Sequence, residues 1–155
     1  MVEHSEEGAL GLVLNRPTAA PVSDHVADWA DVAAPPALVF VGGPVANEVA
    51  VGLAQDPGTP PDSWMEALPG IGLIDLTEPP AAYGGVGRAR VFSGYAGWEA
   101  TQLDFELATG SWVILTADAD TVFTSDPADL WRRVLARDPG LLRMYASYPT
   151  DPRLN

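Results

Sequence analysis

Residues 90–103 read Arg-Val-Phe-Ser-Gly-Tyr-Ala-Gly-Trp-Glu-Ala-Thr-Gln-Leu. The first four residues have the composition of a strand, and the pattern predicts that this strand stops at Gly94. Gly94 and Gly97 predict a turn, because glycine adopts positive φ and lets two backbones approach closely. A helix that carries Gln102 is expected to follow. This stretch therefore predicts a sheet that passes directly into a helix, with two aromatic residues at the junction.

Apolar runs that end at glycine or proline predict further strands, and capped amphipathic patterns predict helices. The expected strands cover residues 9–14, 37–41, 49–53, 71–76, 88–93 and 111–116. The expected helices cover residues 24–31 and 100–108, with a third that starts at Asp126 and ends before Pro139-Gly140. Within 100–108, the alternation of Leu103, Phe105 and Leu107 would also suit a strand.

These elements come in mixed order without an internal repeat, which indicates an α+β or mixed α/β fold. Residues 55–62 and 77–87 are rich in proline and glycine and predict two loops. The length of 155 residues predicts one domain, large enough to bury a hydrophobic core.

The chain is strongly acidic, with a formal net charge of −13 at pH 7. Its eight basic residues are all arginine. The negative electrostatic field of such a chain repels phosphate backbones, so direct nucleic-acid binding is not expected. A protein partner or a small molecule is the expected partner. Solubility is the simpler explanation of the charge.

Cysteine is absent, which excludes disulfides, thiolate metal sites and cysteine nucleophiles. The apolar runs fall short of the ~20 residues that a membrane-spanning helix needs. The first seven residues are acidic and do not resemble a signal peptide. A cytoplasmic location without membrane association is therefore expected.

Five groups of residues resemble signatures of the AlgH/YqgE family and occur in the family's order. They are residues 8–18 (GALGLVLNRPT), residues 41–45 (VGGPV), residues 92–98 (FSGYAGW) with 102–103 and 110–112, residues 122–123 with 130–131, and residues 148–152 (YPTDP). Since these groups span nearly the whole chain, it is identified as a member of that family.

The resemblance implies an α+β fold in which a mixed, bent and bifurcated sheet forms a pseudo-barrel with about three helices outside. It implies that residues 1–155 form a single AlgH/YqgE-like domain that lacks the family's N-terminal strand region. A missing strand would leave unpaired backbone groups and exposed apolar surface. Thr101 also stands where the family commonly has glycine.

Two segments at strand ends are candidates for one small cleft. Asn15 and Arg16 follow an expected strand, and Arg16 could clamp a carboxylate or phosphate. The backbone amides of Gly42 and Gly43 could cradle an anion. The simpler alternatives are turn contacts for Asn15, an ion pair for Arg16 and a tight turn at the glycines.

The third candidate segment contains Tyr95, Trp98 and Gln102. Two aromatic rings beside a polar amide could form the wall of a small-molecule pocket. The alternative is that both rings belong to the core and that Gln102 caps the backbone. We rank this segment first among the three.

Other polar residues are weaker candidates. His4 and His25 lack the spacing of a two-histidine metal site, and Asp118 with Asp120 lacks the order of a calcium loop. Ser93-Gly94 does not form a nucleophile elbow, because residue 91 is valine. We therefore predict no metal, cofactor or catalytic residue.

The sequence thus favours a non-enzymatic regulatory or binding protein with a small ligand cleft. A regulatory role is also implied by the resemblance, because family members are often labelled transcriptional regulators. The alternative is an unrecognised, hydrolase-like enzyme that uses the same cleft, with Arg16 and Gln102 orienting the substrate.

Overall fold

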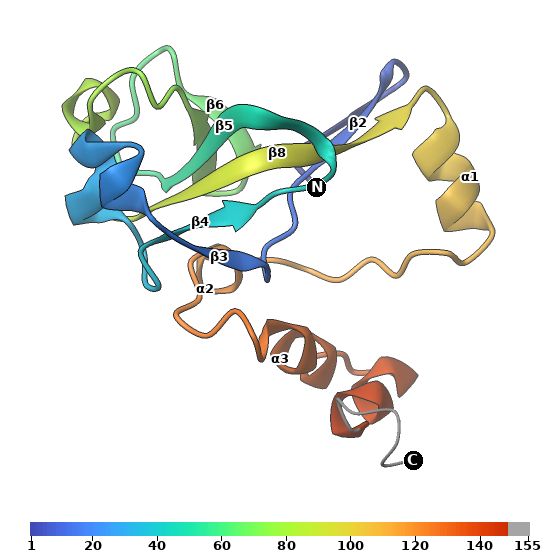
Figure 1. Cartoon of the computed structure of the whole chain (residues 1–155). Helices are drawn as coiled ribbons and strands as arrows, with labels where there is room; N and C mark the ends of the chain where they lie inside the picture. Colours follow the sequence, from blue (N-terminus) through green and yellow to red (C-terminus); the bar gives the residue numbers. More distant parts are fainter. Residues whose placement is uncertain (149–155) are drawn as a thin grey trace.

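A computed structural model describes residues 1–148, in which eight strands form one bent sheet (Figure 1). The strands are β1 Glu3–Ser5, β2 Gly8–Gly11, β3 Pro17–Pro21, β4 Leu38–Val41, β5 Val45–Gln55, β6 Met65–Leu68, β7 Ile71–Ile74 and β8 Ala89–Glu99. The α-helices are α1 Gln102–Ala108, α2 Ala119–Val122 and α3 Leu130–Ala136. The 3₁₀-helices are η1 Val22–Asp24, η2 Ala27–Val32, η3 Pro80–Tyr83 and η4 Leu141–Ser147.

Strand β8 organises the sheet because it changes partners along its length. Its first half lies between β4, which is parallel to it, and β5, which is antiparallel. Its second half pairs with β2, with Gly8 opposite Glu99 and Gly11 opposite Ala96. The path β1-β2-β8-β5-β7-β6 therefore has a branch, β4 with β3, that leaves it at β8. This arrangement confirms the mixed, bifurcated, barrel-like sheet with helices outside.

The prediction that a strand stops at Gly94 is wrong, because β8 continues to Glu99. Gly94 has φ +69°, and a Cβ there would lie 2.7 Å from the carbonyl oxygen of Val45. Glycine thus bends the strand at the point where β4 and β5 give way to β2, instead of ending it. Gly97 lies within the strand.

The first half of β8 is buried on both faces. Val91 belongs to a hydrophobic cluster with Trp29 and Tyr83, whereas Phe92 belongs to a second cluster with Phe40. Because successive strand residues face opposite sides, one strand connects the two clusters. The core of the molecule therefore lies along β8, before its bend.

Arg90 is buried between β8 and the C-terminal part of the chain. Its Nη2 donates hydrogen bonds of 2.8 Å to the carbonyl oxygens of Pro35 and Thr124, and its guanidinium lies 4.3 Å from the centre of the Phe40 ring. Burial lowers the pKa of Arg90 to about 10. Arg90 therefore remains charged at neutral pH and ties the segment before α3 to the sheet.

Several expected elements form with different bounds. The expected strand over 9–14 ends at Gly11, and the expected helix over 24–31 forms the short 3₁₀ segments η1 and η2. Strand β5 is longer than the expected strand over 49–53 and includes a register irregularity between Val45 and Ala50. Helix α1 begins two residues later than the expected helix over 100–108.

Two predictions in the C-terminal third need larger corrections. The third helix begins at Leu130 instead of near Asp126. The Asp126 carboxylate accepts a hydrogen bond from the backbone N–H of Asp129, as an N-cap would, but the residues between form a turn in which Leu130 N–H donates to Pro127 O at 3.3 Å. Residues 111–116, expected to be a strand, form no strand. The family motif at 148–152 extends beyond the described residues.

Candidate functional site: an apolar groove

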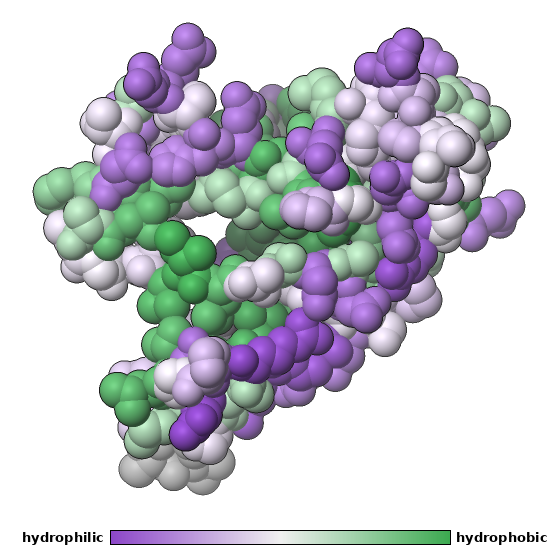
Figure 2. Space-filling model, turned by 180° about the vertical axis from the view of Figure 1, so that it is seen from behind, coloured by the Kyte–Doolittle hydropathy of each residue, from purple (hydrophilic) through white to green (hydrophobic). Residues whose placement is uncertain are grey.

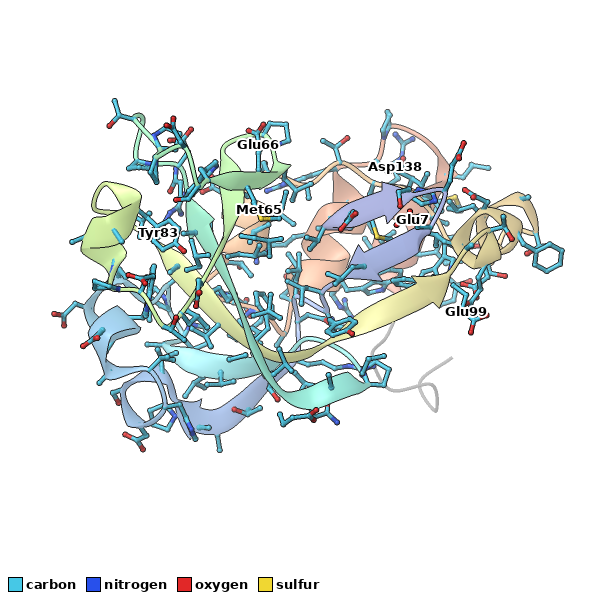
Figure 3. All side chains as sticks on the ribbon, turned by 90° about the horizontal axis from the view of Figure 1, so that it is seen from above. Glu7, Met65, Glu66, Tyr83, Glu99 and Asp138 are labelled. Carbon is cyan, nitrogen blue, oxygen red and sulfur yellow. The ribbon has the colours of Figure 1, made fainter. Side chains whose placement is uncertain are left out.

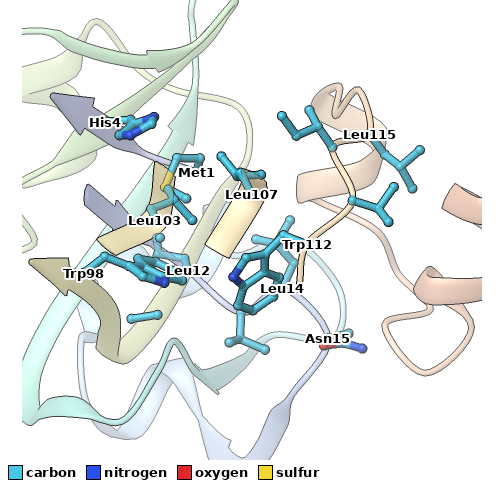
Figure 4. A pocket seen from close by; sticks show the side chains of 15 residues that line it. Met1, His4, Leu12, Leu14, Asn15, Trp98, Leu103, Leu107, Trp112 and Leu115 are labelled. Carbon is cyan, nitrogen blue, oxygen red and sulfur yellow. The ribbon is translucent and has the colours of Figure 1, made fainter. Parts of the chain in front are cut away.

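A groove of about 540 Å³ lies where β2, the second half of β8, α1 and residues 112–115 meet (Figure 4). We call it the apolar groove. Its lining consists of Met1, His4, Gly11, Leu12, Val13, Leu14, Asn15, Ala96, Trp98, Leu103, Leu107, Trp112, Val113, Ile114 and Leu115. His4 and Asn15 are the strongly polar side chains of this set, so the groove is built to hold apolar groups.

One wall of the groove is a pair of tryptophans held by a carboxylate. The rings of Trp98 and Trp112 meet edge to face, with centroids 5.9 Å apart. Glu106 Oε2 accepts hydrogen bonds from both indole nitrogens, at 3.0 Å from Trp98 and 2.5 Å from Trp112, and Oε1 accepts one from Gln102 Nε2 at 3.0 Å. The donors of Trp112, Gln102 and Trp98 hold the pKa of Glu106 below its ordinary value.

Residues 112–117 connect α1 to α2, and residues 112–115 of this segment line the groove. Within the described part of the chain, their backbone N–H and C=O groups form no backbone–backbone hydrogen bond. Trp112, Val113 and Ile114 are respectively 51, 55 and 78% exposed. Figure 2 shows hydrophobic side chains around a hollow on one face of the molecule. Apolar side chains and an unpaired backbone are the properties expected of an open strand edge.

The structure brings the segments of the predicted cleft together through their backbones. Val13 N–H donates to Gly42 O at 2.8 Å, Val41 N–H donates to Arg16 O at 2.9 Å, and Gly42 N–H donates to Ser93 O at 2.9 Å. Among the predicted site residues, Asn15 and Trp98 line the apolar groove.

The other five predicted residues lie outside the lining of the groove. Gly42 and Gly43 are buried, and a Cβ on them would lie 2.2 Å from Gly94 O and 2.1 Å from the carbonyl carbon of Tyr95. They thus permit close packing of the segment after β4 against β8. A ligand-binding role for these glycines remains a prediction.

The side chains of Gln102 and Arg16 are both exposed to solvent. Gln102 Oε1 accepts a hydrogen bond from the backbone N–H of Glu99 at 3.0 Å, which is the capping role considered as the alternative. Tyr95 is partly buried, next to Gly97 on β8. Ligand binding by these three residues likewise remains a prediction.

Sequence reasoning missed most of the lining because it assigned these residues to strands or to the core. Leu12 and Leu14 were expected inside a strand, and Leu103 and Leu107 on the buried face of a helix. The sequence does not show which of its apolar segments lacks a partner strand and therefore stays exposed.

The weaker polar candidates have structural roles. His4 Nε2 lies 3.1 Å from Asp104 Oδ1. Asp118 caps α2 by accepting a hydrogen bond from Thr121 N–H at 2.8 Å, and the hydrogen bonds from Thr121 are the largest cause of its lowered pKa. Asp120 pairs with Arg88. Among residues 1–148, no group of three or more metal-ligating side chains is placed to hold a metal ion.

None of the helices within residues 1–148 has both the length and the apolar character needed to cross a membrane. Comparison with family models matches the AlgH-like family over residues 1–142. The chain therefore belongs to the AlgH-like family, which confirms the resemblance found in its motifs.

Relatives with the family's UPF0301 designation are longer than this chain. A protein of Streptomyces coelicolor is 45% identical over 161 residues, which cover 100% of this chain and 83% of the relative. A protein of Mycobacterium leprae is 39% identical over 160 residues, covering 100% of this chain and 79% of the relative.

Two solved structures share the fold. The crystal structure of protein DIP2367 from Corynebacterium diphtheriae matches with a TM-score of 0.85 and 25% identity, over 94% of this chain and 79% of that chain. The solution structure of AlgH from Pseudomonas aeruginosa matches with a TM-score of 0.65 and 30% identity, over 97% of this chain and 82% of that chain.

Proposed function

We propose that this chain is a non-enzymatic regulatory or binding protein and that the apolar groove is its binding site. The observation that carries the proposal is the exposure of Trp112, Val113 and Ile114 along a groove whose other residues are also mostly apolar. Burial of apolar surface stabilises by about 25 cal/mol per Å², so a ligand that covers these side chains gains binding free energy directly.

The chemistry of the lining supports binding over catalysis. Glu106, the carboxylate nearest to the tryptophan wall, accepts hydrogen bonds from three side chains. Its lowered pKa makes it a weaker base, whereas a general base works best with a pKa near the working pH. The alternative is a hydrolase-like activity at Arg16 and Gln102. The side-chain amide of Gln102 is already hydrogen-bonded to the backbone N–H of Glu99 and to the Glu106 carboxylate.

The charge of the chain supports a partner that is neutral or basic at its rim. With a net charge of −13, an acidic partner or a nucleic acid would be repelled. We therefore place the protein among binding proteins for apolar small molecules or apolar protein segments. We also keep the expectation of a cytoplasmic location, which the absence of cysteine favours.

The test is binding of an apolar fluorescent dye to two matched variants. Ile114→Arg places a charge in the groove, whereas Met65→Arg places one on β6, at a residue that is 62% exposed and outside the lining of the groove (Figure 3). We expect the dye to bind wild type and Met65→Arg equally and Ile114→Arg about tenfold more weakly. Equal binding to all three proteins would refute the groove as the binding site.

The predicted cleft residues are tested in the same assay. Arg16→Ala should leave dye binding unchanged if the groove alone is the site, whereas Gln102→Ala removes a donor to Glu106 and tests whether the tryptophan wall depends on it. A thermal-shift panel of nucleotides, sugar phosphates and carboxylic acids then tests the smaller cleft. A shift that is lost in Arg16→Ala would establish an anion site there, and turnover lost in that variant would favour the enzyme.

A further inference from the structure

We infer that a second pocket of this protein binds a small aliphatic ammonium compound, with the positive group beside Glu48 and the hydrocarbon part on the sheet. The pocket has a volume of about 370 Å³ and is lined by residues of β3, β4, β5 and the first half of β8, together with the residues after η1. Its lining shares no residue with that of the apolar groove. The inference therefore adds a separate site and does not depend on the proposed function.

One wall of the second pocket is the irregular part of β5. In the pairing of β5 with β8, residues 46–49 stand opposite Gly94 alone. Such an insertion bends a strand and re-aims its side chains. Ala46 lies in the left-handed region, with φ +48°, and the two residues after it, Asn47 and Glu48, line the pocket. The insertion thus places an exposed carboxylate at the pocket.

The floor of the second pocket consists of branched aliphatic side chains. Val91 belongs to the hydrophobic cluster around Trp29, and Val26 and Val39 pack against that cluster. The side chain of Phe92, which also lines the pocket, belongs to the other cluster. The volume is at the small end of the range of ligand pockets, about 300–1,000 Å³. The floor therefore suits a short, branched hydrocarbon group, whose burial removes apolar surface from water.

Two hydroxyl groups that line the second pocket have already donated their protons. Ser93 Oγ donates to the carbonyl oxygen of Asn47 at 2.5 Å, and Thr18 Oγ1 donates to that of Val39 at 2.7 Å. Thr18 Oγ1 also accepts a hydrogen bond from Ala20 N–H at 3.0 Å. A hydroxyl has one proton and two lone pairs, so each oxygen keeps at least one lone pair with which to accept. These groups favour a ligand that donates hydrogen bonds, and a primary ammonium group has three N–H donors.

The charges around the second pocket select the sign of the ligand. The ion pairs formed within residues 1–148 use other acidic residues, all of them aspartates, so the Glu48 carboxylate is available to a ligand. Among the described residues that line the pocket there is no lysine or arginine, and His25 is the one side chain that can become positive. In a chain with a net charge of −13, a cation is attracted and a carboxylate is repelled.

The experiment compares three probes that have nearly the same hydrocarbon group and different charges: isopentylammonium, isopentanol and isocaproate. Each is titrated into the ¹⁵N-labelled 155-residue chain, and binding is followed by the NMR shifts of individual backbone amides. The titrations are made at about pH 7.5, where histidine side chains are ordinarily neutral. Residue-by-residue detection separates the second pocket, at residues 47–50 and 91–93, from the apolar groove, at residues 112–115.

We expect isopentylammonium to shift the amides of residues 47–50 and 91–93, isopentanol to do so about tenfold more weakly, and isocaproate to leave them unchanged. Glu48→Gln should weaken the binding of isopentylammonium about tenfold and leave that of isopentanol unchanged. Glu6→Gln is the matched control, because Glu6 is exposed and lies outside the second pocket. Ala50→Leu keeps the charge but fills the pocket, so both probes should bind it more weakly.

Several outcomes would overturn the inference. Equal binding of all three probes would remove the selection by charge, and preferred binding of isocaproate would make the site one for anions. Equal weakening by Glu48→Gln and Glu6→Gln would mean that net charge alone attracts the ammonium ion. Shifts confined to residues 112–115 would assign the probes to the apolar groove and leave the proposed function intact. Absence of any shift at residues 47–50 and 91–93 would refute the second pocket as a site.

Discussion

Two apolar runs of this chain, Leu38–Val41 and Trp112–Leu115, have nearly the same composition and opposite structures. The first is β4, which pairs with β3 on one side and β8 on the other. The second forms no strand, although its residues are among the strongest strand formers. Phe40 in the first run is fully buried, whereas Ile114 in the second is 78% exposed.

The comparison shows that an apolar run can form a strand, but that it does so only where neighbouring strands pair with it. Strand stability comes from cross-strand pairs and from packing on a face, and both require a neighbour. Residues 112–117 contact the rest of the fold through Trp112, whose ring meets Trp98 and whose Nε1 donates a hydrogen bond to Glu106. The following predictions test this difference, starting with the largest effect.

Truncation of one residue in each run should have very different costs. Phe40→Ala removes a ring that lies 5.9 Å from Phe92 and under the Arg90 guanidinium, so we expect a loss of about 3–5 kcal/mol in the free energy of unfolding. Ile114→Ala should change it by less than about 0.5 kcal/mol, because the side chain is already exposed.

Urea or thermal unfolding of both variants checks this prediction, with Phe105→Ala as a control at an exposed aromatic residue on α1. A large loss in Ile114→Ala would mean that residues 112–117 are packed in solution, and the contrast between the two runs would disappear.

The close approach that follows β4 gives the second contrast. Gly43→Ala would place a Cβ 2.1–2.3 Å from the backbone of Tyr95 and Ala96, which cannot move without disturbing β8. We expect a loss of about 2–3 kcal/mol, as for an overpacked core. Gly87→Ala, where no atom lies within 4 Å of the added Cβ, is the matched control and should be nearly neutral.

Unfolding free energies of the two glycine variants decide the role of the predicted anion cradle. If Gly43→Ala folds with unchanged stability but loses a ligand, the glycine belongs to a binding site, as the sequence suggested. If it loses stability, Gly43 is required by the packing of the segment after β4 against β8.

The strands that are short apolar runs bounded by glycine or proline could be predicted from the sequence, whereas β1, β3 and β6 contain no such run and were not expected. Strands β4 and β7 and the first half of β8 formed where expected. The bend at Gly94 was misread as a turn, because a glycine with positive φ ends a strand in one context and redirects it in another. The two cases differ in strand pairing: here β8 continues past Gly94 because it pairs with β2 after it has paired with β5.

The candidate site was less predictable because it depends on which surfaces stay uncovered. Asn15 and Trp98, which line the groove, were predicted because strand ends and aromatic residues beside glycine are common in sites. Ile114 could not be found, since its local sequence is that of a core strand. Its exposure depends on the number of strands that the whole fold supplies to its edge.

The smallest expected effect concerns Glu106, which ties the unpaired run to the rest of the fold through Trp112 Nε1. Its pKa is lowered from 4.5 in the folded state by the donors of Trp112, Gln102 and Trp98. A carboxyl with a lowered folded pKa stabilises the protein above its unfolded pKa, and this contribution is lost as the pH falls through the folded value. Glu106→Gln should therefore lose less free energy of unfolding than wild type when the pH falls below about 4.5. Unfolding curves measured at several pH values check this.

Glu99→Gln is the matched control, because it removes a charge from the end of β8 without removing an acceptor of the indole nitrogens. If both variants flatten the pH dependence equally, the effect is one of net charge in an acidic protein. If only Glu106→Gln does so, and hydrogen exchange after residue 111 speeds up while that of β4 is unchanged, then one carboxylate holds the unpaired run beside the groove. A run fixed in this way keeps its open edge available, which distinguishes a binding edge from a segment that merely failed to find a place in the sheet.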